Sequence, residues 1–418
     1  MKKNYLKTPL ELPCGVILKN RLVKSAMTER VSNKKLEPNE KHHRLYKQWA
    51  ATGAGLLITG NVIVDHIHLE SAGNIHAADE RILPQMKAWA AAAKNGDNQV
   101  WVQISHAGRQ TNKFCTRRPK APSEVKLRQL GLFGKPKAMT EADIEAVIEG
   151  FVKTAKNCQE AGFTGIQIHA AHGYLLSQFL SPHTNLRTDQ WGGNLENRSR
   201  LLMTIIQQIR EAVGPRFPIG VKLNSSDFQR GGFTEEESLE VIRMLNGKID
   251  LLEISGGTYE KLVFFEMNEE QASSTPQIKE STRQREAYFL EFSKKVRAVS
   301  QLPLLITGGF RSFDFCNQAL ANQELDCIGM ARPFITNLDQ IAGFLDNKVD
   351  KLENLVLRTG IKAFDSAAEG GFYAHQIIRL AKGRKTKLRQ KRSKLSALWF
   401  STFLIYHEFT KAMLNRFG

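Results

Sequence analysis

Eight short segments with strand character recur along this chain, and stretches with helical character separate them. Several of these segments are continuous apolar runs, as expected of strands that are buried on both faces of a sheet. The predicted strands are Arg21–Met27, Leu56–Val64, Val100–His106, Gly165–Ala170, Ile219–Asn224, Leu251–Ser255, Pro303–Gly308 and Cys327–Ala331. Eight strand–helix units predict an α/β fold, a (β/α)8 TIM barrel, and an open doubly wound sheet is the alternative that strand count leaves open.

Helical periodicity is clearest in two of the intervals between the strands. After Thr140, apolar residues recur at spacings of three and four along a single helix face. Thr234 is followed three residues later by Glu237, just before an apolar run, which is the pattern of a capping box. Both intervals therefore predict helices that start at a threonine N-cap.

All eight predicted strands lie before residue 345, although the chain has 418 residues. One barrel with an appendage accounts for this length. We therefore expect a barrel domain over residues 1–370 and a basic, aromatic C-terminal extension over residues 371–418. The barrel is expected to be complete without the extension.

Positive charge is concentrated at the C-terminus. The formal net charge is +17, and the segment from His375 to Gly418 holds eleven Lys or Arg against one acidic residue, Glu408. A moderately basic body argues against a nucleic-acid partner and for a separate role of the tail. Nine of these cations lie within Arg379–Lys394, just before an aromatic segment that starts at Leu395. This pattern suggests contact with an anionic membrane, and a helix docked on the barrel is the equal alternative.

The cysteine pattern and the N-terminus bear on location. The five cysteines form no CxxC pair and have no zinc or iron–sulfur spacing, which favours a reducing compartment. No signal peptide is expected, because Pro9 and Pro13 interrupt the N-terminus, and no apolar run is long enough for a spanning helix. The expected location is the cytoplasm, with the extension as a candidate for contact with the cytoplasmic face of a membrane.

Polar residues and glycines follow several predicted strands, at the end of a barrel where active sites form. Gly308 and Gly309 end the seventh strand and Arg332 follows the eighth, a set that predicts a phosphate cradle. Lys222 lies between Val221 and Leu223 in an apolar strand, where its charge needs an anionic partner.

The end of the fourth predicted strand carries His169, His172 and Tyr174. Histidines three residues apart can share a metal ion, but no third ligand is obvious nearby. The second interpretation is a pair of hydrogen-bond donors to one developing oxyanion, with Tyr174 as proton donor. Taken alone, the pair also fits packed structural histidines.

A long segment without regular periodicity, Ala107–Ala138, follows the third predicted strand and holds Arg109, Lys113, Arg117, Arg118 and Lys120 among its basic residues. Long loops after a barrel strand commonly form lids or binding loops. We expect a lid here, and a solvated excursion is the alternative.

One long motif resembles the old yellow enzyme family. It reads HAAHGYLLSQFLSP over residues 169–182 and continues as NLRTDQWGGNLENR over residues 185–198. The segments GLLITG at 55–60, QISHAGR at 103–109 and SGGTY at 255–259 are similar to the same family. The resemblance covers residues 5–345 and includes the N-terminal barrel of the 2,4-dienoyl-CoA reductases, whose iron–sulfur segment and second domain this chain lacks.

The resemblance implies FMN as cofactor and NADH or NADPH as reductant. It implies His169 and His172 as donors to the substrate carbonyl, Tyr174 as proton donor, and Lys222 as the cation beside the flavin. The implied cofactor-binding residues are Ser25, Ala26, Met27, Thr28, Asn61, Gln103, Lys222, Ser255, Gly256, Gly308, Gly309, Ala331 and Arg332. Thr28 stands where some relatives have cysteine, so the flavin potential is expected to differ.

The implied function is an ene-reductase. Hydride passes from NAD(P)H through flavin N5 to the β-carbon of a small activated alkene of the enone type. Two alternatives remain on the residues alone. One is a flavin-free lyase or isomerase of a phosphorylated substrate, and the other is a non-catalytic flavin-binding interaction protein.

Overall fold

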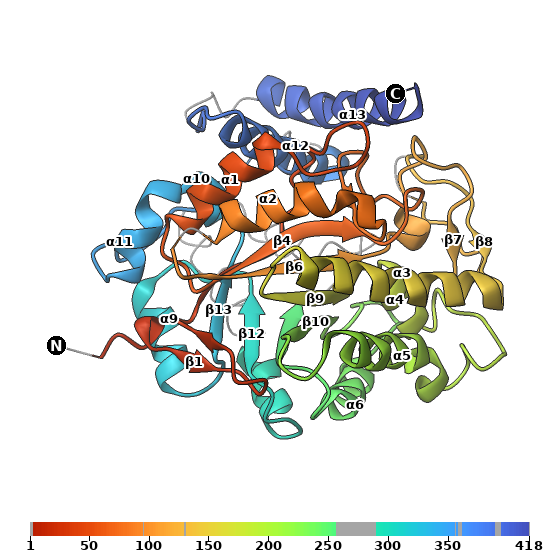
Figure 1. The fold of residues 1–418 in the computed structure, drawn as a ribbon, viewed down its shortest axis with the longest axis horizontal. Coiled ribbons are helices and arrows are strands. Elements are labelled where there is room, and N and C mark those ends of the chain that lie inside the picture. The colour runs from red at the N-terminus through yellow and green to blue at the C-terminus, as the bar shows by residue number, and fades with distance from the viewer. Residues whose placement is uncertain are drawn as a thin grey trace.

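A closed barrel of parallel strands forms the centre of the molecule (Figure 1). The computed structural model describes residues 3–94, 96–128, 131–255, 290–355, 357, 362–388 and 394–417. The barrel strands are β3 (Leu22–Lys24), β4 (Leu56–Ile63), β6 (Gln99–Ser105), β9 (Gly165–Ala170), β10 (Ile219–Asn224), β11 (Leu251–Ser255), β12 (Leu304–Thr307) and β13 (Cys327–Met330).

The barrel closes through its first strand. β3 pairs in parallel with β13, where Lys24 lies opposite Met330, and also with β4, where Lys24 lies opposite Leu57. The first strand thus has a neighbour on each side, and one of these neighbours is the last strand. The sheet therefore has no open edge between β3 and β13. The structure therefore confirms the predicted TIM barrel, and the open doubly wound sheet is wrong.

The strand prediction is accurate except at its start. Seven strands agree with the predicted ranges to within one residue at each end, but β3 ends at Lys24 and not at Met27. The Ser25 N–H still donates to the Met330 carbonyl at 2.9 Å. Beyond it the chain leaves the sheet, and the Met27 carbonyl lies so close to Gly60 that a Cβ there would be 2.4 Å from it.

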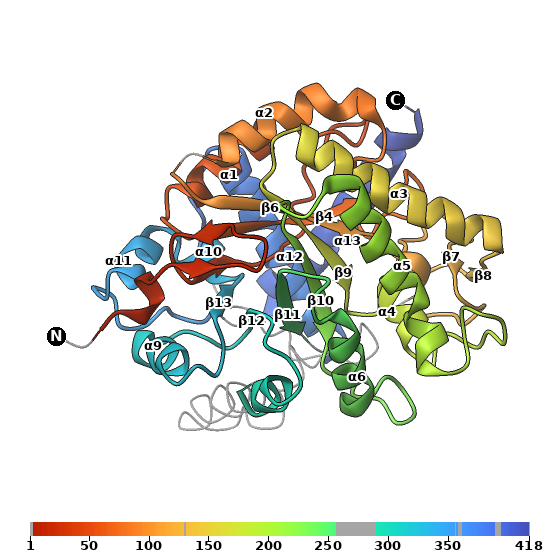
Figure 2. The same ribbon diagram turned by 60° about the horizontal axis from the view of Figure 1, so that its bottom comes forward.

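Helices surround the barrel on its outer side (Figure 2). Those before the extension are α1 (Glu40–Ala50), α2 (Leu83–Ala93), α3 (Glu141–Glu160), α4 (Leu175–Leu180), α5 (Leu195–Val213), α6 (Glu235–Leu245), α9 (Phe313–Ala321), α10 (Pro333–Thr336) and α11 (Ile341–Leu345). Both predicted threonine caps are confirmed. The Thr140 and Thr234 side chains accept the N–H groups of Asp143 and Glu237, each at 3.2 Å.

Apolar side chains fill the amino end of the barrel. A hairpin of β1 (Leu10–Glu11) and β2 (Ile17–Leu18) brings Leu12 and Leu18 against Trp101 and Leu251. Trp101 occupies space left by two glycines, because a Cβ on Gly165 or Gly220 would lie 2.6 or 2.9 Å from its ring. This layer seals the amino end, so polar groups further along the same strands meet near the other end.

The described part of the predicted lid segment, residues 107–128 and 131–138, contains regular structure. It contains η3 (Gly108–Gln110) and a short pair of strands, β7 (Lys120–Ala121) with β8 (Lys137–Ala138). Arg109 is buried, and the Lys120 ammonium lies 2.6 Å from Asp143 of α3. The lid role itself stays a prediction.

The C-terminal extension consists of two helices that pack on each other, α12 (Lys362–Ala381) and α13 (Lys394–Phe417). The expected domain boundary at residue 370 falls inside α12. Ile377, Ile378 and Ala381 of this helix belong to the same hydrophobic cluster as the barrel helices. All eight barrel strands end by residue 330, as expected, and the extension packs against the helices around them. The division into two domains stays a prediction.

Helix α13 lies on loops that follow β3 and β4. Its Glu408 carboxylate accepts the Ser71 hydroxyl at 2.6 Å, the Ala72 N–H at 2.8 Å and Arg30 Nε at 3.1 Å. Phe409 packs against Phe114 of the predicted lid, with ring centroids 5.5 Å apart. The docked-helix alternative thus describes how α13 sits on the barrel.

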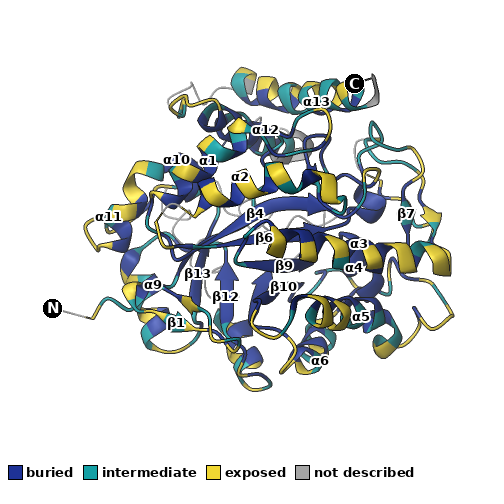
Figure 3. Cartoon of the chain, in the orientation of Figure 1, coloured by how far each residue is buried: buried dark blue, intermediate teal, exposed yellow. Residues whose placement is uncertain are grey.

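The outer side of α13 remains exposed (Figure 3). Its exposed apolar side chains are Leu395, Leu398, Trp399, Ile405, Tyr406, Phe409 and Leu414. Within the described residues, no helix combines the length and apolar character needed to cross a membrane.

Candidate active site

The histidines predicted at the end of the fourth strand come together with Tyr174. The His169 ring centroid lies 5.1 Å from that of His172 and 4.8 Å from that of Tyr174, both in edge-to-face geometry. His169 is the fifth residue of β9, and the other two follow at its carboxyl end. The three predicted catalytic side chains thus form one cluster at the end of the barrel where active sites lie.

Backbone geometry holds His172 in an unusual conformation. Its φ is 59°, in the left-handed region that few non-glycine residues adopt. The His172 N–H donates to Asn224 Oδ1 at 3.1 Å, and its carbonyl accepts Gln110 Nε2 at 2.8 Å. Its Nε2 lies 2.7 Å from the Ser255 hydroxyl. Contacts from β10, β11 and η3 therefore hold the backbone and ring of His172 in place, as is common where strained backbone serves a site.

Both histidines are neutral at neutral pH. Burial lowers the pKa of His169 well below its usual value, and the charges of His172 and Lys222 lower it further. Burial and Lys222 have the same effect on the pKa of His172. His169 Nδ1 accepts the Ala171 N–H at 3.2 Å, so its proton is assigned to Nε2. A neutral imidazole of this kind donates one N–H and is a poor acid.

Lys222 has a partner that the sequence analysis did not name. Its ammonium lies 2.9 Å from the Glu253 carboxylate, because Lys222 of β10 is in register with Glu253 of β11. The Lys222 side chain is 6% exposed and that of Glu253 0%. The anionic partner required by the buried lysine is thus a protein side chain, and any contribution of an anionic flavin adds to it.

A chain of amides connects this ion pair to Gln103. Gln103 Nε2 donates to Gln167 at 2.7 Å, and Gln167 Nε2 donates to Glu253 at 2.6 Å. The three side chains come from β6, β9 and β11 and lie inside the barrel. Sequence reasoning missed Gln167 and Glu253, although a charged residue in the otherwise apolar run Leu251–Ile254 was a visible signal.

Among the described residues, neither histidine of the pair belongs to a group of three potential metal ligands. The one such group consists of Asp65, His68 and His106, on the loop after β4 and at the end of β6. His68 Nε2 accepts the Lys120 N–H and His106 Nδ1 accepts the Gly108 N–H, at 2.9 and 3.0 Å. The other ring nitrogens therefore carry protons toward Asp65, and a metal ion would have to displace them.

The family of the chain follows from a comparison with known proteins. Residues 6–346 match the model of the NADH:flavin oxidoreductase / NADH oxidase family. The chain belongs to this family. The predicted resemblance to the old yellow enzymes is thereby confirmed, and the protein is a flavin-dependent oxidoreductase. The matched residues end before α12, so the extension lies beyond them.

Fungal relatives are similar over most of the chain. The NADH-dependent flavin oxidoreductase nadA of Aspergillus parasiticus is 37% identical over 332 residues, covering 75% of this chain and 72% of that protein. The iliE protein of Hypocrea jecorina is 34% identical, covering 81% and 88%. The iliE protein of Neonectria sp. is 35% identical over 79% of this chain. The chain spans only 45% of that last relative's length.

Solved structures share the fold. The 2-naphthoyl-CoA reductase complex superposes with a TM-score of 0.75 at 24% identity, covering 82% of this chain and 52% of that one. The old yellow enzyme homologue of Zymomonas mobilis superposes with a TM-score of 0.68 at 22% identity, covering 84% and 95%. At these identities the likeness supports the barrel and not a substrate.

The family uses FMN with NADH or NADPH, and the residues present fit FMN. A Cβ on Gly329 of β13 would lie 2.1 Å from the Thr307 hydroxyl and 2.7 Å from that of Ser25, so a larger residue at this position would collide with both hydroxyl groups. Gly308 and Gly309 have φ of 123° and 82°, which favours glycine. Asn61 Oδ1 is buried, and no hydrogen-bond partner is found for it in the described part of the chain. Membership of this flavin oxidoreductase family contradicts both alternatives that the sequence left open, the flavin-free lyase or isomerase and the non-catalytic flavin-binding protein.

The remaining predicted cofactor residues occupy the same end of the barrel. Ser25 and Thr307 share a hydrogen bond of 2.7 Å, and Thr28 donates to Glu70 at 2.8 Å. Asn61 Nδ2 also donates to Glu70, at 3.1 Å. Ala26, Met27 and Ala331 are partly buried. Gly256 lies outside the described residues.

Arg332, predicted to bind phosphate, contacts the extension. Its guanidinium lies 3.4 Å from the Glu369 carboxylate and 5.3 Å from the ring centroid of Tyr373, both on α12. Glu369 is fully buried. The extension therefore positions an arginine at the carboxyl end of β13, a contact that spacing in the sequence did not indicate.

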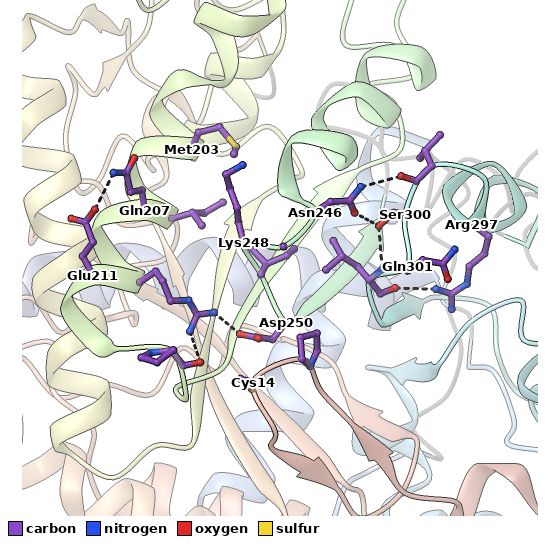
Figure 4. Close-up of a pocket in the computed structure, with 18 of the residues that line it drawn as sticks. Cys14, Met203, Gln207, Glu211, Asn246, Lys248, Asp250, Arg297, Ser300 and Gln301 are labelled. Atoms are coloured by element: carbon purple, nitrogen blue, oxygen red, sulfur yellow. Dashed lines mark hydrogen bonds and ion pairs between the residues drawn. The ribbon is translucent and has the colours of Figure 1, made fainter.

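A cavity of about 1020 Å³ lies at the other end of the barrel (Figure 4). Its lining includes Cys14 and Asp250, and Asp250 immediately precedes β11. Arg210 pairs with Asp250 at 2.6 Å, and the Ser300 hydroxyl donates to Asn246 at 2.5 Å. Because this cavity adjoins the amino ends of the strands, it is separate from the candidate active site.

Proposed function

We propose that the protein is an ene-reductase that reduces a small activated alkene, of the enone type, with NADH or NADPH. The observation that carries this proposal is the pair of neutral histidines at the end of β9, with Tyr174 against His169. When bound, FMN relays hydride from the nicotinamide to the β-carbon of the acceptor.

His169 and His172 are proposed to donate hydrogen bonds to the acceptor carbonyl oxygen. Two neutral N–H donors stabilise the negative charge that develops on this oxygen without giving up a proton. The Ser255 hydroxyl lies 2.7 Å from His172 Nε2 and interacts with the ring when no substrate is bound. The substrate oxygen would take the place of this hydroxyl. Removal of one such donor from an oxyanion site typically slows the reaction by about 100–1,000-fold.

Tyr174 is proposed to protonate the α-carbon. Its ring is nearly buried and packs edge-to-face on His169, so the phenol is held beside the donors to the carbonyl. A positioned proton donor contributes about 100–10,000-fold to a rate.

Lys222 is proposed to hold the negative charge of the reduced cofactor, with Glu253 and the amide chain through Gln103 setting its position. The remaining proposed cofactor contacts are those of the residues between Ser25 and Thr28, and of Asn61, Ser255, Gly256, Gly308, Gly309, Ala331 and Arg332. Ser255, Lys222 and His169 lie on adjacent strands, which favours one shared site for cofactor and acceptor.

The experiment that tests this proposal is an anaerobic screen of acceptors with the purified full chain, followed by NAD(P)H oxidation. Enones and other activated alkenes are compared with quinones, disulfides and saturated ketones of similar size. We expect turnover with the alkenes and a reduced C=C bond in the product. Reduction of quinones or disulfides without any alkene product would contradict the proposed substrate class and leave the family assignment intact.

Contact of the extension with an anionic membrane is a separate proposal. The exposed apolar side chains of α13, Trp399 and Tyr406 among them, adjoin the basic run Arg379–Lys394. Cationic residues near an anionic surface contribute about 1 kcal/mol each, and buried aromatic area adds to this. Cosedimentation with anionic vesicles at low salt, reversed at high salt, is the expected result.

A further inference from the structure

A small cavity lined by positive charge lies where the extension meets the barrel. Its volume is about 230 Å³, and its lining contains two histidines and no Asp or Glu. Six of the lining residues are cationic: Arg30, Lys41, Arg379, Lys382, Arg384 and Lys411. They come from the segment after β3, from α1, from α12 with the turn after it, and from α13. Four separate parts of the sequence thus bring cations to one place.

These cations are poorly neutralised by the protein. Arg30 pairs with Glu70 and Glu408, and Arg379 donates to the Lys385 carbonyl. For Lys41 and Lys382, no ion pair is found within the described ranges of the chain. Like charges this close repel one another, and a bound anion would offset that repulsion.

The surrounding titratable groups respond to this charge. Burial and, to a smaller extent, the charge of Lys41 lower the pKa of Lys411 to about 8, against the opposing charge of Glu408. Burial also lowers the pKa of His407 to about 4, with contributions from Arg30, Lys411 and Lys382. His407 Nδ1 is buried, and no hydrogen-bond partner is found for it among the described residues.

The geometry points to a binding site for a phosphate group in this cavity, one that is separate from the flavin phosphate cradle at Gly308, Gly309 and Arg332. Arginine and lysine clusters bind phosphate through several charge-assisted hydrogen bonds. The cavity is smaller than the roughly 300–1,000 Å³ of sites for drug-sized ligands, which fits a phosphate or diphosphate group. The group could belong to a soluble phosphate compound or to a lipid headgroup, and the chemistry recognised is the same.

The site adjoins the candidate active site. Arg30 lines the cavity and also donates to the Thr28 carbonyl at 3.2 Å. Thr28 belongs to the segment proposed to line the flavin. A phosphate group in the cavity would therefore contact the same arginine that supports this segment.

The test uses the full chain and inorganic pyrophosphate, followed by calorimetric titration at constant ionic strength. The variant is Lys382→Gln with Arg384→Gln, because both side chains are exposed and their loss should leave folding intact. The matched control, Lys137→Gln with Lys156→Gln, removes the same charge from exposed positions that do not line the cavity. Both variants are first checked for FMN content and melting temperature.

We expect wild type and control to bind pyrophosphate, and the cavity variant to bind at least about tenfold more weakly, the effect of losing one or two charge-assisted hydrogen bonds. Binding to phosphatidic acid vesicles is measured in parallel, with phosphatidylcholine vesicles as the reference. The proposal is overturned if the three proteins do not differ in binding either pyrophosphate or phosphatidic acid vesicles.

A lipid source is indicated if the cavity variant alone binds phosphatidic acid vesicles more weakly. A soluble source is indicated if pyrophosphate binding depends on the cavity and vesicle binding does not.

Discussion

At the scale of single residues, substitutions of the histidine pair should affect the two half-reactions of the proposed reaction differently. We predict that His169→Ala and His172→Ala each slow enone reduction by about 100-fold or more, because each removes a donor to the developing oxyanion. Reduction of FMN by NAD(P)H involves no such oxygen and should change much less. Stopped-flow measurement of both half-reactions checks this.

The exposed His183, whose Nε2 lies 2.6 Å from the Arg230 carbonyl, provides the control for the histidine variants. His183→Ala should leave both half-reactions unchanged. If the variants of the pair leave enone reduction intact as well, the two histidines have a structural role only.

The Lys222–Glu253 pair makes a second prediction at this scale. Lys222→Met should lower the FMN reduction potential, because the reduced anionic cofactor loses a cation. Glu253→Gln should raise it, because Lys222 then loses the carboxylate at 2.9 Å. Each shift is expected to be about 30 mV or more, which corresponds to about 1.4 kcal/mol for a two-electron couple. Potentiometric titration measures both, and shifts of the same sign would refute this role.

Lys24 leads to a prediction on pH. The Lys24 side chain is fully buried. Its ammonium donates to the Ile58 carbonyl at 2.8 Å and lies 4.1 Å from the Trp49 ring centroid. Burial lowers its pKa from 10.5 to about 8, against the opposing charge of Glu29. Between these two pH values the unfolded chain binds more protons than the folded one at this site, so the contribution of Lys24 to stability increases with pH.

Wild type should therefore gain stability relative to Lys24→Met as the pH rises from about 8 toward about 10.5. Melting temperatures of both proteins across this range measure the difference, and taking the difference removes the effect of other titrating groups. A constant gap between the two proteins would mean that Lys24 keeps its proton throughout.

At the scale of elements, one carboxylate of α13 makes several of its contacts with the barrel loops. Glu408 accepts three hydrogen bonds from Arg30, Ser71 and Ala72. Glu408→Ala removes the acceptor of all three hydrogen bonds, and we predict a loss of about 2 kcal/mol in the free energy of unfolding or of local opening. Hydrogen exchange of α13 measures the local part and denaturant titration the global part.

Glu240→Ala is the matched control, because Glu240 is exposed and pairs with Arg243 three residues away on α6. Surface pairs of this kind contribute about 0–1 kcal/mol. Equal effects of the two substitutions would show that Glu408 contributes no more than a surface charge.

At the scale of the whole molecule, the extension is part of the packed body. Deletion of residues 376–418 removes Ile377, Ile378 and Ala381 from the main hydrophobic cluster. We predict a lower melting temperature and exposed apolar surface in the shortened chain, because large buried side chains contribute about 1.5–3 kcal/mol each. Thermal unfolding and binding of a hydrophobic dye measure this.

Deletion of residues 389–418 alone is the milder comparison, since it removes α13 and retains α12. It should be better tolerated, with FMN retained. A chain without residues 376–418 that melts like the intact chain would mean that this part of the extension is separable from the barrel, as its sequence suggested.

Local pattern in the sequence determined most of the fold. Apolar runs predicted seven of the eight strands to within one residue at each end, because a strand buried on both faces leaves a continuous signal. Thr140 and Thr234 marked helix starts, because a cap depends on residues three apart. The histidine pair and Tyr174 were also found within one short motif, at positions that the barrel places at its active end.

Only the tertiary structure decided which distant residues meet. Glu253 beside Lys222, Glu369 beside Arg332 and Glu408 beside Ser71 are pairs between segments far apart in the chain. Strand register and helix docking bring them together, and no spacing in the sequence encodes such a contact. The extension looked separable for the same reason. Its charge and aromatic content are local properties, whereas its attachment to the barrel depends on apolar side chains and carboxylates that find their partners only in the folded chain.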